Sequence, residues 1–186
     1  MLNVPNVITL VRLALVPVTA WLLWQGAYGP ALVVFLSAAV SDFLDGVIAR
    51  RFDQASVFGA MLDPIADKLN MFVATVMLAW HGWLPLWLAA AIVLRDVVIV
   101  SGALVYRAKL GHVEIAPTRL SKVNTFIEFG VLLSVMAHAA AWVDAAAWLP
   151  AVFVLVFATV LASGAQYVWV WGWKAASETR RVARTE

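Results

Sequence analysis

Six apolar stretches of 18 to 24 residues follow one another along the chain, with only short polar links between them. They are residues 7–24, 30–49, 60–80, 84–106, 120–140 and 148–171. A helix rises about 1.5 Å per residue, so each stretch can cross a hydrocarbon core about 30 Å thick. Charged residues make up only 13% of the chain and the mean hydropathy is +0.90, which excludes an ordinary soluble domain. We therefore expect an all-α integral membrane protein with six transmembrane helices.

Basic residues fall on one side of this arrangement. Links 25–29, 81–83 and 141–147 contain no Lys or Arg. The other links and the C-terminal end hold the basic residues Arg50, Arg51, Arg107, Lys109, Arg119, Lys122, Lys174, Arg180, Arg181 and Arg184. Because positively charged flanks of membrane helices stay in the cytoplasm, we expect both termini to be cytoplasmic. Residues 1–173 would then form the membrane domain, and residues 174–186 a basic cytoplasmic tail.

The N-terminus and the overall charge exclude other classes of protein. No basic segment precedes the first apolar stretch, and Arg12 falls inside it, so we expect it to be retained as a membrane helix and not removed as a signal peptide. The formal net charge is only +2, which argues against a nucleic-acid partner. The chain has no cysteine, which excludes disulfides and thiolate metal sites. We expect it in a bacterial cytoplasmic membrane.

Four carboxylates stand at helical spacing on both sides of one cytoplasmic link. Asp42 and Asp45 are i, i+3, and Asp63 and Asp67 are i, i+4, so each pair shares a helix face. Asp53, in the link itself, is expected to be solvated. Ionisable groups inside membrane helices are costly and usually functional, which favours a site over ion pairs with neighbouring basic residues. Hard oxygen ligands select ions such as Mg²⁺ or Mn²⁺, and two such ions would suit phosphoryl transfer.

Small and basic residues accompany these carboxylates. Gly46 and Ala49 lie on the same helical sector as Asp42 and Asp45 and would let a ligand approach the backbone, or two helices pack closely. Gly59 precedes the third helix, where free N–H groups could meet a phosphate. Arg50 could bind a phosphate through two parallel hydrogen bonds.

The string Asp42-x2-Asp45-Gly46-x2-Ala49-Arg50-x8-Gly59-x3-Asp63-x3-Asp67 resembles the signature of the CDP-alcohol phosphatidyltransferases at all eight fixed positions. The resemblance implies transfer of a phosphatidyl group from CDP-diacylglycerol to a hydroxyl acceptor, with release of CMP. It also implies that the four aspartates hold two metal ions and that Asp67 is the general base. The CDP-lipid would contact the residues Asp42, Asp45, Gly46, Ala49, Arg50, Gly59 and Asp63.

Further segments resemble the eukaryotic-type cardiolipin synthases within this family. These segments are "LRDVVIVSGALVYR" and "PTRLSKVNT". The resemblance favours phosphatidylglycerol as acceptor, with glycerol 3-phosphate as the alternative, because Asn124 stands where the glycerophosphate enzyme typically has Lys. Candidate acceptor-binding residues are Arg95, Arg119, Lys122 and Asn124. Glu128 departs from the family pattern, which typically has Gln there. Family members are often homodimers.

Two readings from other classes remain open. Intramembrane carboxylates also occur in divalent-cation transporters, which would take up ions without releasing CMP. The position of the carboxylates near one membrane face argues against a conduit. A non-catalytic assembly protein would retain its function after substitution of Asp67 by Asn.

Overall fold

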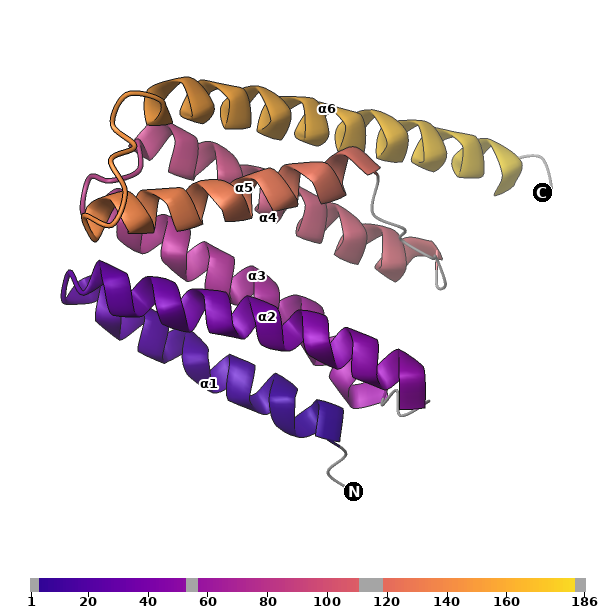
Figure 1. Cartoon of the computed structure of the whole chain (residues 1–186). Coiled ribbons are helices and arrows are strands. Elements are labelled where there is room, and N and C mark those ends of the chain that lie inside the picture. Colours follow the sequence, from indigo (N-terminus) through magenta and orange to yellow (C-terminus); the bar gives the residue numbers. More distant parts are fainter. Residues whose placement is uncertain (1–3, 53–56, 111–118, 183–186) are drawn as a thin grey trace. The chain divides into compact units, whose positions relative to one another are not determined.

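A computed structural model describes residues 4–52, 57–110 and 119–182, with side chains described at 10–41, 68–102 and 120–169. The described residues form six α-helices and no strand (Figure 1). The helices are α1 (Val4–Trp24), α2 (Tyr28–Phe52), α3 (Val57–Trp80), α4 (Leu86–Leu110), α5 (Arg119–Ala139) and α6 (Leu149–Val182). Each predicted apolar stretch corresponds to one of these helices, which confirms the all-α prediction.

The long apolar stretches support a membrane location. Within the described side chains, Leu120–Ala139 of α5 and Leu149–Trp169 of α6 are long and apolar enough to cross a bilayer. Shorter apolar segments occur at Leu10–Trp24, Tyr28–Ser41 and Lys68–Trp80.

Several helices extend beyond their predicted ends. The prediction ended the sixth helix at residue 171, whereas α6 continues to Val182. Hydropathy marks where a sequence stops being apolar, but a helix needs only residues that tolerate helical geometry. The segment after residue 171 contains no proline and is rich in Ala, Lys, Glu and Arg, which favour helix. Most of the predicted tail is therefore helical.

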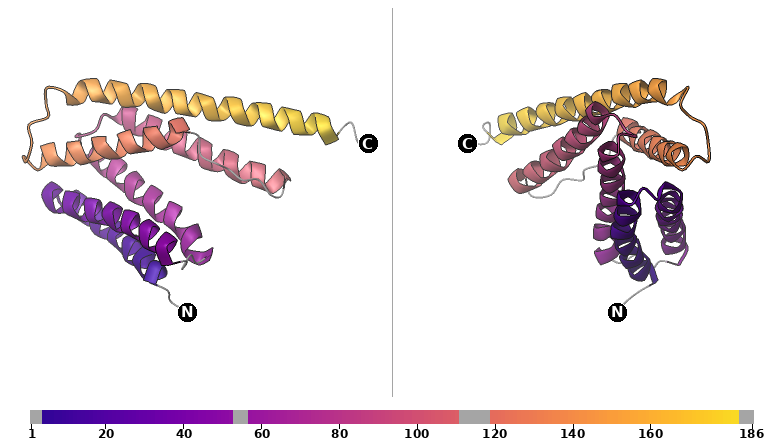
Figure 2. Two further views of the ribbon diagram at one scale, coloured as in Figure 1. Left: turned by 45° about the vertical axis from the view of Figure 1, so that its right-hand side comes forward. Right: turned by 90° about the vertical axis from the view of Figure 1, so that its left-hand side faces the viewer.

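The chain divides into two compact units. Unit 1 comprises Met1–Leu86 and Phe129–Leu149, and unit 2 comprises Trp87–Glu128 and Pro150–Glu186. In unit 1, α1 packs along both α2 and α3, whereas the described parts of α2 and α3 contact each other less (Figure 2). Phe35 of α2 stacks on Phe129 of α5 with ring centroids 5.2 Å apart, which ties α5 to this core.

One end of unit 1 is closed by aromatic side chains. Trp24 stacks on Trp80, and Tyr28 meets His81 and Trp83 edge to face. The turns there need unusual backbone angles: Gly26 and Gly82 have φ of 72° and 78°, a region that glycine adopts without strain. This end holds the loops after α1, α3 and α5, so the end of α2 and the start of α3 lie at the opposite end of unit 1.

Candidate active site and buried polar cluster

The carboxylate motif lies where α2 ends and α3 begins. Asp42, Asp45, Gly46, Ala49 and Arg50 belong to the last turns of α2, and Gly59, Asp63 and Asp67 belong to the first half of α3. The side chains of all these residues lie outside the described ones, so their helices alone are placed. The end of α2 and the start of α3 lie at the same end of unit 1 (Figure 1), with only four residues between them. This matches the prediction that the two helices are antiparallel neighbours.

The oxygen ligands that this motif offers suit a hard divalent cation. Four carboxylates offer only oxygen ligands, the kind that Mg²⁺ and Mn²⁺ prefer. Among the described side chains, no group of three or more His, Cys, Asp or Glu residues could hold a metal ion. The motif aspartates remain the candidates for such a site.

Two further polar side chains are buried in unit 1, one on α1 and one on α3. Arg12 of α1 is only 1% exposed, and Asn70 of α3 is 6% exposed. Asn70 lies i+7 from Asp63 and i+3 from Asp67, so the three residues share a face of α3. Sequence reasoning missed Asn70, although this spacing was a usable signal. The Oδ1 atom of Asn70 is buried and has no hydrogen-bond partner within the described part of the chain.

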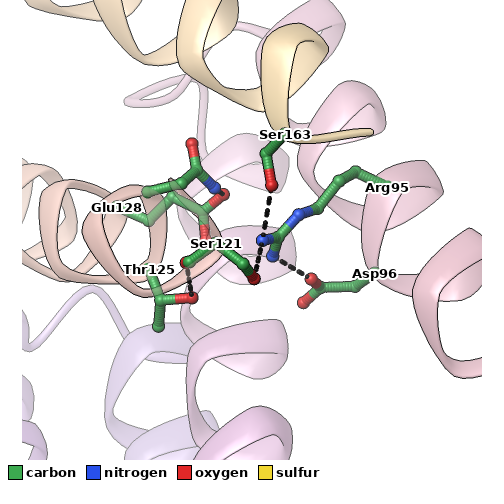
Figure 3. A network of polar contacts seen from close by, with 7 residues as sticks. Arg95, Asp96, Ser121, Thr125, Glu128 and Ser163 are labelled. Atoms are coloured by element: carbon green, nitrogen blue, oxygen red, sulfur yellow. Dashed lines mark hydrogen bonds and ion pairs between the residues drawn. The ribbon is translucent and has the colours of Figure 1, made fainter. Parts of the chain in front are cut away.

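Unit 2 contains a buried polar cluster centred on Arg95, which is 4% exposed (Figure 3). Its Nη1 donates to Oδ1 of Asp96 at 2.7 Å. Its Nη2 donates to Oγ of Ser121 at 2.7 Å and to Oγ of Ser163 at 3.1 Å. One guanidinium thus connects α4, α5 and α6. The Nε atom of Arg95 is buried and has no hydrogen-bond partner among the described residues.

A polar stripe on α5 continues this cluster. Its members are spaced i, i+3, i+4 and i+7, which places them on one side of the helix: Ser121, Asn124, Thr125 and Glu128. Asn124 is fully buried, and its Nδ2 donates to Oε1 of Glu128 at 2.6 Å. The amide nitrogen donates in this contact, so the Asn124 amide is oriented with its Nδ2 toward Glu128. Glu128, the departure from the family pattern, is buried at 2% exposed.

The four predicted acceptor-binding residues therefore differ in position. Arg95 and Asn124 are both buried in unit 2, and the bond from Arg95 to Ser121 reaches α5 one turn before Asn124. Lys122 is exposed instead. The side chain of Arg119 lies outside the described ones. Ser121 and Ser163 were not predicted; the stripe on α5 could have revealed Ser121, but no sequence pattern singles out Ser163.

The comparisons with known proteins agree with the signature. The CDP-alcohol phosphatidyltransferase family matches residues 2–162, so the chain belongs to that family. A cardiolipin synthase (CMP-forming) of Streptomyces coelicolor is 32% identical over 192 residues, covering all of this chain and 86% of the relative. A cardiolipin synthase (CMP-forming) / mitochondrial hydrolase fusion protein of Schizosaccharomyces pombe is 35% identical over 180 residues, covering 89% of this chain and 30% of the relative.

A relative with another name is also similar. A CDP-diacylglycerol–glycerol-3-phosphate 3-phosphatidyltransferase of Pseudomonas fluorescens is 43% identical over 115 residues, covering 60% of this chain and 59% of the relative. The matches thus span less than two thirds of the Schizosaccharomyces and Pseudomonas proteins. The relatives thus carry two kinds of name, and the family match of this chain does not depend on either of them.

Proposed function

We propose that the protein transfers a phosphatidyl group from CDP-diacylglycerol to a hydroxyl acceptor and releases CMP. The observation that carries this proposal is the complete signature from Asp42 to Asp67, on the last turns of α2 and the first half of α3. The names of the relatives, which are CMP-forming cardiolipin synthases and a CDP-diacylglycerol-dependent transferase, support the same reaction.

The motif aspartates would bind metal ions, and one of them would also act as a base. Asp42, Asp45, Asp63 and Asp67 would hold a pair of Mg²⁺ or Mn²⁺ ions, which when bound neutralise charge on the phosphate oxygens. Asp67 would also accept the proton of the acceptor hydroxyl as general base. The hydroxyl oxygen then forms a bond to the β-phosphorus while the bond to CMP breaks.

The cytidine diphosphate portion would be held by the small and basic members of the motif. Arg50 supplies a cation that can bind phosphate with two parallel hydrogen bonds. Gly46, Ala49 and Gly59 leave room for the ligand beside the backbone, because they have small side chains or none.

The favoured acceptor is phosphatidylglycerol, which gives cardiolipin. Arg95 and Asn124 would bind its head group, with Arg119 and Lys122 contributing positive charge. Phosphatidylglycerol carries a phosphodiester with a single negative charge, whereas glycerol 3-phosphate carries a monoester nearer −2. Asn124 is neutral where the glycerophosphate enzyme typically has Lys, and its amide is bonded to the acidic Glu128. Both features favour the less negative acceptor.

The alternative acceptor is glycerol 3-phosphate. It is favoured by one specific observation, the 43% identity to the Pseudomonas fluorescens enzyme, which exceeds the identity to either cardiolipin synthase named above. The aligned part covers 60% of this chain. The donor and the residues proposed to bind it are the same in both alternatives.

We further propose that all six helices span the membrane, with both termini and the carboxylate motif on the cytoplasmic side. The uneven distribution of Lys and Arg supports this orientation. Homodimer formation and a bacterial cytoplasmic membrane remain predictions, and the named relatives come from both bacteria and a yeast.

An acceptor panel tests the function directly. Purified protein in detergent micelles would receive CDP-diacylglycerol, Mg²⁺ or Mn²⁺, and either phosphatidylglycerol or glycerol 3-phosphate, with CMP release and lipid products measured by mass spectrometry. We expect cardiolipin from phosphatidylglycerol. Phosphatidylglycerophosphate as the only product would establish the alternative, and ion uptake by proteoliposomes without CMP release would indicate a transporter.

A further inference from the structure

An apolar groove runs between α4 and α6 in unit 2. Its volume is about 530 Å³, within the range of roughly 300–1,000 Å³ typical of ligand sites. Small residues, among them Ala91, Gly164 and Ala165, leave space in its lining, and larger apolar side chains such as Leu94 and Leu161 flank it. Leu94 and Leu161 are both more than half exposed, so the groove is accessible from the surface of the unit.

The groove lies along a part of α6 that can cross a membrane. Its α6 residues fall between Phe157 and Val168, within the stretch Leu149–Trp169. With α6 spanning the membrane, as proposed above, the medium around the groove would be lipid hydrocarbon. An acyl chain is therefore the molecule that an apolar groove of this kind would meet.

Arg95 belongs both to this groove and to the buried polar cluster. It is among the groove-lining residues, and a Cβ atom added to Gly164 would lie 3.8 Å from its Cγ. On its other side, its Nη atoms are bonded to Asp96, Ser121 and Ser163. Its buried Nε has no acceptor among the described residues. A buried N–H without an acceptor is unfavourable, so a ligand oxygen that reached it would remove that cost.

A ligand that satisfies both features must be amphipathic. It needs an acyl chain for the groove, and an ester or phosphate oxygen next to that chain for the guanidinium. A phospholipid has this structure, whereas glycerol 3-phosphate has no acyl chain. A second copy of this chain fits less well, because the exposed large side chains of α4 and α6 in this region, such as Leu94, Val98, Leu161 and Val168, are apolar and offer Arg95 no acceptor.

We propose that the groove between α4 and α6 holds one acyl chain of the acceptor phospholipid, with the glycerol-phosphate portion of that lipid at Arg95. This inference rests on the proposed function, because it assumes that the acceptor is a lipid. It implies that the shape of unit 2, and not only its charges, selects a lipid acceptor over a water-soluble one.

The test fills the groove and compares acceptors of different chain length. Ala165→Leu adds bulk to the lining, and Ala162→Leu is the matched control, because Ala162 is also exposed on α6 but does not line the groove. CMP release would be measured in mixed micelles with dioleoyl phosphatidylglycerol and with dihexanoyl phosphatidylglycerol. A leucine that displaces about three methylene groups of the ligand should raise KM for the dioleoyl lipid at least about tenfold.

The dihexanoyl lipid should respond less than about twofold, because its chains are too short to gain from the full groove. Ala162→Leu should change neither value. An equal rise in KM for both lipids would overturn the proposal, because it would indicate an effect on the fold or on donor binding. An unchanged KM for the dioleoyl lipid would also overturn it, since the groove would then hold only bulk lipid.

A second measurement separates this inference from the proposed function. Phosphatidylglycerol with a photoreactive diazirine in its acyl chain should label peptides from α4 and α6 in the wild type, and less so in Ala165→Leu. Such labelling with CMP release only from glycerol 3-phosphate would overturn both the proposed acceptor and this inference, because the lipid in the groove would then not be the acceptor. Cardiolipin synthesis without this labelling would refute the groove and retain the function. Dissociation of a dimer by Ala165→Leu alone would assign the groove to a second copy and overturn the proposal.

Discussion

Replacing Ser163 by alanine should destabilise unit 2 through the buried Arg95 guanidinium. Ser163 is fully buried on α6 and accepts a hydrogen bond of 3.1 Å from Nη2 of Arg95. Hydrogen bonds to charged groups contribute about 1.5–3 kcal/mol in soluble proteins, whereas those between membrane helices average about 0.6 kcal/mol and reach about 1.7. Because Nη2 keeps its 2.7 Å bond to Ser121, the loss is partial. We expect the free energy of unfolding to fall by about 1 to 1.5 kcal/mol.

The assay is reversible unfolding in mixed micelles by added SDS, followed by tryptophan fluorescence. A double-mutant cycle with Arg95→Met isolates the hydrogen bond, and Ser163→Ala should cost less than about 0.5 kcal/mol in that background. Ser134→Ala is the matched control, because within the described part of the chain the hydrogen bond of its Oγ stays on its own helix, at 2.7 Å from the Gly130 carbonyl. The control should change stability by no more than about 0.5 kcal/mol. An equal cost of Ser163→Ala in both backgrounds would refute the reasoning, since the serine would then act by packing alone.

Three other outcomes follow from the motif and from the packing of unit 1. Asp67→Asn should lower CMP release at least about 100-fold without reducing membrane insertion, whereas Asp53→Asn should retain activity; near-normal turnover of the first variant would exclude Asp67 as the base. Removal of divalent ions by EDTA should abolish CMP release, and added Mg²⁺ or Mn²⁺ should restore it; full activity in EDTA would contradict the metal site. Gly29→Ala should lower the midpoint of thermal unfolding, because its Cβ would lie 3.1 Å from Cζ2 of Trp142, and Trp142→Leu should relieve that effect. Wild-type stability of the Gly29 variant would show that the indole can move aside.

Sequence alone predicted the family and the elements, because both depend on local patterns. Spacings of three and four residues between aspartates define helix faces without any knowledge of tertiary contacts. The same signature identified the family that the comparisons then confirmed. The helix ends were less predictable, as α6 shows by continuing to Val182. Hydropathy locates an apolar segment, whereas the end of a helix depends on local propensity.

The polar cluster of unit 2 could be predicted only in part, because it depends on contacts between distant segments. Arg95 and Ser163 are 68 residues apart, and neither position carries a local signal for the other. The resemblance suggested both Lys122 and Asn124 as acceptor-binding residues; in the structure Lys122 is exposed, while Asn124 two residues later is fully buried. Helical periodicity explains this difference, because residues i and i+2 point to different sides of a helix.

The same contacts give Arg95 a structural role in unit 2 and orient it for the proposed binding of the acceptor. Burying a cation in an apolar unit is costly unless it is paired and hydrogen-bonded. Asp96, Ser121 and Ser163 meet that requirement at the Nη atoms, and in doing so they hold the guanidinium plane in one orientation. A fixed plane keeps the guanidinium in a constant position, so a ligand at Arg95 would not have to order it on binding. Variants of Arg95 should therefore lower stability and acceptor affinity together, whereas Ser163→Ala should mainly lower stability and Ala165→Leu should mainly lower affinity.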